Sequence, residues 1–147
     1  MMEAGFLLLS TADSLFEKVK HDYGVLQSNQ LDPYSAFNFF VTAEHLPEWV
    51  GRRTLKYSNP YLRICSHLAT GAKHYIVTQK YKTQVQSTTV DIYVEEGYVE
   101  GDYFEEVLTI QLSEEEAENI GAASIPILEL ADKIIEFWEA YFEAQHS

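Results

Sequence analysis

Two helix-start signals, each an acceptor side chain followed by proline, constrain this chain more than any other feature. Asp32-Pro33 and Asn59-Pro60 each place a side-chain oxygen where it accepts hydrogen bonds from free N–H groups, and a proline where no N–H is needed. We therefore expect one helix from Asp32, with Pro47 near its end, and another from Pro60 to about His74. Because the connection between them is short, the two helices are expected to pack antiparallel.

Each of these two expected helices carries a polar stripe whose members are spaced 4, 3 and 4 residues apart, which puts every stripe on one side of its helix. Facing each other, the two stripes would form one cleft that contains several histidines. The stripes are Asn38, Thr42, His45 and Trp49 on the first helix and Arg63, His67, Thr70 and His74 on the second. From this cleft the candidate binding residues are Asn38, His45, Trp49, Lys73 and His74.

The hydrophobic period changes along the rest of the chain. Apolar residues recur at helical spacing over residues 3–28 and from Ser124 onward, and a capping-box pattern begins a short helix at Ser113. Segments rich in Val, Ile, Thr and Tyr predict strands instead. These segments are 75–82, 88–94 and 103–112.

These elements predict an α+β fold in a single domain over residues 1–147. We expect a mostly α-helical four-helix bundle with a small three-stranded antiparallel sheet inserted before the C-terminal helix. The helical part would span 1–74, the sheet 75–112 and the C-terminal helices 113–147.

Charge is distributed unevenly along the chain, whose net charge is −13. Residues 1–80 hold eight Lys and Arg against seven acids, whereas residues 81–147 hold two against sixteen. The second half therefore repels phosphate, so direct nucleic-acid contact would have to use residues 1–80. The acids of the second half are interleaved with aromatics, which favours binding to a protein partner, including a basic or nucleic-acid-binding one. The alternatives to this interpretation are a homo-oligomer and a charge that only keeps the protein in solution.

The chain's location is expected to be cytoplasmic. No apolar run has the length needed to span a bilayer, and the apolar stretch Phe6 to Leu9 follows Glu3 without a preceding basic residue, unlike a signal peptide. The single cysteine, Cys65, excludes an intramolecular disulfide and fits a reducing compartment. We expect neither membrane association nor a cofactor.

Metal binding and catalysis are the alternatives to a binding protein. His45, His67 and His74 could supply nitrogens to a metal, and Glu44 or Glu48 a carboxylate, although no HExxH spacing or cysteine pair supports such a site.

The segment Arg63-Ile64-Cys65-Ser66-His67 resembles the HEPN nuclease superfamily of helical domains. That resemblance implies metal-independent RNA cleavage, usually across a dimer, with Arg63 on phosphate and His67 as the acid/base. Fewer residues separate the Arg and the His here than in most of the family, and Ile64 stands where a polar residue is usual.

A second resemblance covers most of the chain. The segments Asn38-Phe39-Phe40-Val41-Thr42-Ala43-Glu44-His45 and His67-Leu68-Ala69-Thr70-Gly71-Ala72-Lys73-His74 are similar to a group of small uncharacterised bacterial and phage proteins. The resemblance implies a prokaryotic or phage origin and no chemistry. We therefore expect a non-catalytic, acidic binding or accessory protein that acts through protein–protein contacts.

Overall fold

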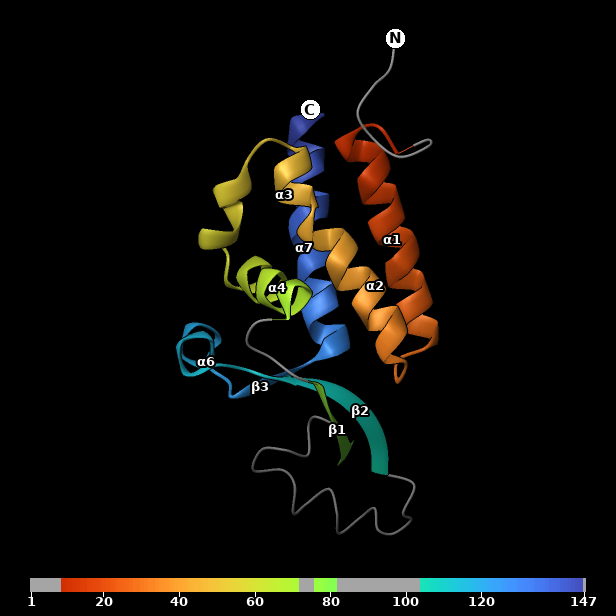
Figure 1. Cartoon of the computed structure of the whole chain (residues 1–147), viewed down its shortest axis with the longest axis vertical. Coiled ribbons are helices and arrows are strands. Elements are labelled where there is room, and N and C mark those ends of the chain that lie inside the picture. The colour runs from red at the N-terminus through yellow and green to blue at the C-terminus, as the bar shows by residue number, and fades with distance from the viewer. Residues whose placement is uncertain (1–8, 72–75, 82–103, 147) are drawn as a thin grey trace.

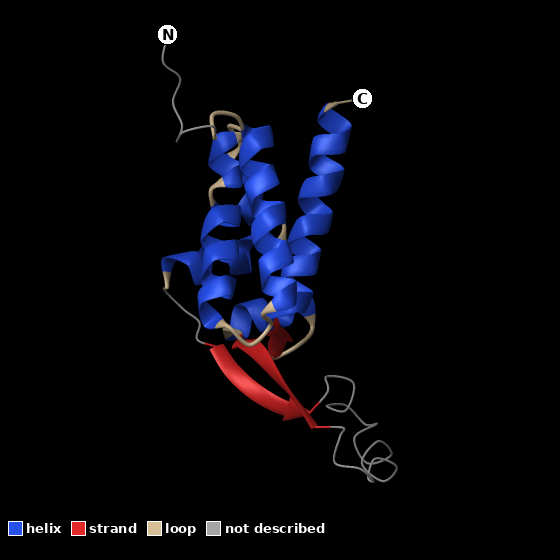
Figure 2. Ribbon diagram, turned by 90° about the vertical axis from the view of Figure 1, so that its right-hand side faces the viewer, coloured by secondary structure: helices blue, strands red, loops and turns tan. Residues whose placement is uncertain are grey.

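The computed structural model describes residues 9–71, 76–81 and 104–146 and combines a helical bundle with a small sheet. Helices α1 (Ala12–Ser28), α2 (Pro33–Glu44) and α7 (Ile127–Gln145) form the body of the bundle, and α4 (Pro60–Thr70) packs on α2. The sheet lies at one end of these helices, as Figures 1 and 2 show. The predicted α+β class with mostly helical content is confirmed.

The predicted count of four helices is wrong, since the described ranges also contain shorter elements. The predicted second helix ends at Glu44, and α3 (Leu46–Trp49) follows it after His45. Pro47 explains this break because it has no N–H to bond the carbonyl of Ala43 and its ring would clash with that carbonyl in a continuous helix. The remaining short elements are the 3-10 helix η1 (Arg53–Tyr57) and α6 (Glu114–Ile120).

Two predicted helix ends also move. Helix α1 begins at Ala12, where the side chains of Thr11 and Ser14 form a reciprocal capping box, whereas the prediction began it at residue 3. Residues 3–8 lie outside the described part. Helix α4 ends at Thr70 and not near His74, because Gly71 adopts a left-handed φ of 68° and its N–H bonds back to the last helical turn.

The sheet is antiparallel, with strand order β1-β2-β3. Strands β1 (Ile76–Tyr81) and β2 (Phe104–Gln111) occupy two of the predicted strand segments. The predicted set of three is nevertheless wrong, since β3 (Ser124–Pro126) comes from a segment expected to open the last helix. Pro126 pairs with Thr109 and ends this short edge strand, where a missing N–H is tolerated. The predicted strand 88–94 lies outside the described residues.

One hydrophobic core joins the bundle to the sheet. On β2, Leu108, Thr109 and Ile110 are all buried, so both faces of the strand are covered at this end. Helix α7 crosses the core, and the hydroxyl of Tyr23 on α1 donates a hydrogen bond to its Asp132. Burial, and then this carboxylate, raise the pKa of Tyr23 to about 12. The largest fully buried apolar side chains are Val19, Leu26, Phe39, Leu46, Ile64, Ile110, Ile127, Leu130, Ile134 and Trp138.

No helix in the described part of the chain is both long enough and apolar enough to cross a bilayer.

Replacing glycine with alanine should have opposite effects at two exposed positions. At Gly24, inside α1, a Cβ meets nothing within 4 Å, so Gly24→Ala should stabilise the protein by about 0.5–1 kcal/mol. At Gly71 there is equal space but φ is +68°, so Gly71→Ala should destabilise by about 1 kcal/mol. Denaturant unfolding measures both free energies, and shifts of the same sign would contradict these helix boundaries.

Candidate functional site

In the polar stripe predicted on the first helix, Thr42 points to α1 and not to α4. The hydroxyl of Thr42 lies 3.1 Å from Oδ2 of Asp22, a buried carboxylate on α1. Nζ of Lys18 lies 2.6 Å from the same oxygen, so this cluster links the two helices. The other stripe residues do not line a cleft: Asn38 and His45 are exposed, and Trp49 is 36% exposed.

The polar stripe of α4 faces α6. The guanidinium of Arg63 lies 3.0 Å from Oε2 of Glu115, and Nδ1 of His67 lies 2.5 Å from Oε2 of Glu116. Glu116 is buried and also accepts from the hydroxyl of Ser113 in the capping box of α6. The two stripes therefore face different neighbours, and the described members of the predicted cleft do not meet. Lys73 and His74 lie outside the described residues.

The contacts of Arg63 and His67 with α6 bear on the RNA cleavage that the HEPN resemblance implies. Arg63 and His67 share one side of α4, as the resemblance to HEPN domains requires, but each contacts a carboxylate of α6. A phosphate placed there would have to displace Glu115 and approach the buried Glu116, which is electrostatically unfavourable. RNA cleavage stays a prediction.

Within the described ranges, no three His, Cys, Asp or Glu side chains come together as a metal-binding group. Since His74 lies outside those ranges, the histidine metal site also stays a prediction.

The face of α4 opposite its polar stripe makes the contact with α2. The thiol of Cys65 donates to the carbonyl of Phe40, with Sγ 3.4 Å from the oxygen, so the backbones approach closely. Beyond this contact, the first half of α4 lies near the end of α2, and Leu68 and Ala69 lie near the earlier turns of α2. One cavity opens on each side of this contact, and the two differ in character.

The first cavity is polar, with a volume of about 200 Å³. Its walls come from four elements: the end of α2, α3, η1 and the first half of α4. Backbone bonds from Gly51 to Glu48 and from Arg52 to Pro47 fold the connector back on α3, which brings η1 over the opening. We call this cavity the polar pocket; it is lined by Ala43, Glu44, Pro47, Glu48, Arg53, Lys56, Leu62, Cys65 and Ser66.

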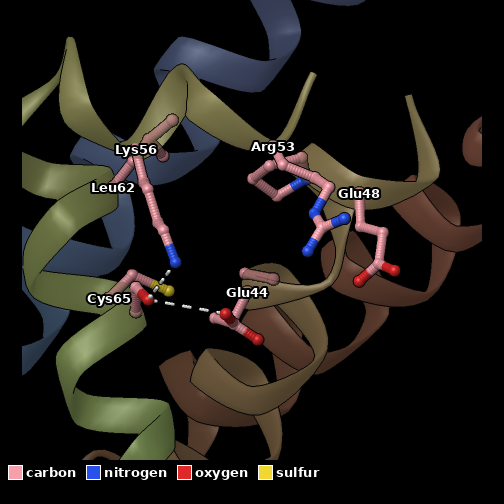
Figure 3. A pocket seen from close by; sticks show the side chains of 9 residues that line it. Glu44, Glu48, Arg53, Lys56, Leu62 and Cys65 are labelled. Carbon is pink, nitrogen blue, oxygen red and sulfur yellow. Dashed lines mark hydrogen bonds between the residues drawn. The ribbon is translucent and has the colours of Figure 1, made fainter. Parts of the chain in front are cut away.

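The positive and negative side chains of the polar pocket come from different helices. Arg53 and Lys56 point into it from η1, Glu44 lies across the space from both, and Glu48 lines the pocket beside Arg53 (Figure 3). Nζ of Lys56 lies 3.4 Å from the hydroxyl of the buried Ser66, which lies 3.5 Å from Oε2 of Glu44. In the described part of the chain, no ion pair joins these four charged groups.

Cys65, at the floor of the polar pocket, is not poised as a nucleophile. Burial raises the pKa of its thiol, and the negative charge of Glu44 raises it further. The reactive thiolate is therefore scarce at neutral pH. The other polar groups of the pocket can hold a polar molecule through charge and hydrogen bonds.

The second cavity is an apolar groove of about 420 Å³ between the first half of α2 and the second half of α4. Phe37 is 62% exposed at its rim and Tyr34 78% exposed. Large aromatic side chains in such positions are typical of contact surfaces. We call it the apolar groove; it is lined by Pro33, Tyr34, Ala36, Phe37, Phe40, Val41, Leu68 and Ala69.

Sequence reasoning missed both cavities. For the apolar groove, the signal was that apolar residues of α2 cover more than one face: Phe39 and Phe40 are buried, whereas Phe37 points outward. For the polar pocket, the signal was weaker. The sequence suggests a role for Glu44 and Glu48 only as metal ligands, and no pattern in the connector indicates that Arg53 and Lys56 line the same pocket.

Comparisons of the chain with protein families, with curated proteins and with solved structures found no match.

Cys65 should be unreactive toward thiol reagents in the folded protein at pH 8, because its raised pKa and burial leave little accessible thiolate. Ellman's reagent should label it only after unfolding, at a rate that follows the unfolded fraction. Rapid labelling of the native protein would contradict the close packing of α4 on α2.

Proposed function

We propose that this protein is a non-catalytic binding protein that acts through protein–protein contact, with the apolar groove as its contact surface. The observation that supports the proposal is the exposure of Phe37 and Tyr34 beside a hollow lined almost wholly by apolar side chains. Exposing these rings to water is unfavourable, so covering them with a partner's apolar side chains would contribute directly to affinity.

The partner we propose is a positively charged protein that inserts an apolar side chain into the groove. The chain carries a net charge of −13, so two copies repel each other, whereas a basic protein is attracted over several ångströms. Helices α6 and α7 present much of this charge at the surface, on the exposed residues Glu114, Glu115, Glu118, Glu129, Glu136, Glu139 and Glu143. The interleaved aromatics Tyr93, Tyr98 and Tyr103 lie outside the described residues.

The test compares two exposed aromatics. Phe37→Ala removes a ring of the groove, and Tyr57→Ala removes a ring that is 69% exposed on η1, outside the groove. Wild-type protein and both variants are immobilised and incubated with lysate of the host, and any protein retained differentially is then purified. We expect a basic protein whose affinity falls about tenfold or more with Phe37→Ala, stays unchanged with Tyr57→Ala, and weakens with salt.

Two results would overturn the proposal. One is that no protein distinguishes Phe37→Ala from Tyr57→Ala while the wild type stays a monomer. The other is a wild-type dimer, seen by analytical ultracentrifugation, that Phe37→Ala dissociates; the groove would then be a contact between copies of this chain.

A further inference from the structure

The polar pocket has a charge arrangement that the proposed protein contact does not use. Its cationic wall is Arg53 and Lys56, from one 3-10 turn, and its anionic wall is Glu44 and Glu48, one helical turn apart in sequence. Figure 3 shows the guanidinium of Arg53 and the ammonium of Lys56 directed into the space above Glu44. Opposite charges that share a cavity without pairing leave room for a ligand between them.

The balance of these charges limits what can bind. Two cations and two carboxylates sum to zero, so a dianion would meet Glu44 and Glu48, and a polycation would meet Arg53 and Lys56. A molecule that carries one positive and one negative group satisfies both walls, and each contact is a charge-assisted hydrogen bond in a partly enclosed site.

The size and the floor of the polar pocket further limit which ligands can bind. Its volume of about 200 Å³ is below the range of about 300–1,000 Å³ typical of sites for drug-sized ligands. At the floor, the buried hydroxyl of Ser66 bridges Lys56 and Glu44, and the Cys65 thiol and Leu62 leave space only for a short side chain. The walls are held by packing, since Ala43, Pro47 and Leu62 are buried.

We propose that the polar pocket binds a small free α-amino acid, with its carboxylate on Arg53 and Lys56 and its ammonium group on Glu44 and Glu48. The Ser66 hydroxyl, placed between the two walls, accepts from one and donates to the other and so fixes Lys56 and Glu44 in position. This site is independent of the apolar groove, from which it is separated by the contact of Cys65 with Phe40.

The test is an NMR titration of the full chain, labelled with 15N, with glycine, L-alanine and L-serine in turn. We expect at least one to give saturable shifts at the amides of Glu44, Glu48, Arg53 and Lys56, and none at Tyr34. N-acetylglycine, which lacks the ammonium group, and glycine methyl ester, which lacks the carboxylate, should each bind about tenfold more weakly or worse.

A matched pair of variants locates the site. Arg53→Gln should weaken binding about tenfold, whereas Arg52→Gln, which changes the neighbouring exposed arginine outside the pocket, should leave the affinity within about twofold. Both arginines are exposed, so neither change should affect folding, which thermal unfolding checks.

Three outcomes would overturn the proposal. The first is that none of the three amino acids gives a saturable shift up to about 10 mM, since a weaker affinity would be negligible. The others are equal affinities for N-acetylglycine and glycine, and equal effects of the two arginine variants. Because Phe37 lies in the other cavity, Phe37→Ala should not change amino-acid binding, and failure of the groove proposal would leave this one standing.

Discussion

The close contact between α2 and α4 determines the rest of the structure. A small residue, Cys65, lets α4 approach until its thiol reaches a backbone oxygen of α2. A larger side chain at this position would force the helices apart. With the apolar sides of the two helices joined here, their polar sides must point to other neighbours: Thr42 to α1, and Arg63 and His67 to α6.

Local signals in the sequence predicted the elements well. The caps at Asp32 and Asn59 and the capping box at Ser113 depend on neighbouring residues, and the structure contains each of them. The errors arose where tertiary contacts decide. Ser124 to Pro126 has a helix-start composition, but pairing with β2 outweighs that preference and makes it a strand.

The described members of the predicted cleft lie apart for a related reason. Helical spacing shows which residues share a side, but it does not show which neighbour that side will meet. His67 could equally well have faced α2 or α6, and only the fold places Glu116 beside it. The polar pocket forms only because the connector turns back on α3. Backbone hydrogen bonds produce this turn, and no pattern of side chains in the sequence predicts them. Predicting such sites therefore requires the packing, not only the periodicity.

The orientation of the α4 polar stripe toward α6 is the claim on which both cavities depend, and nuclear Overhauser contacts measure it directly. In a protein labelled with 13C and 15N, we expect cross-peaks between the His67 ring and the Glu116 side chain, and between Cys65 and the backbone of Phe40. Cross-peaks from the His67 ring to His45 or Thr42 would contradict the account, since they would turn α4 toward the cleft that its sequence alone suggests.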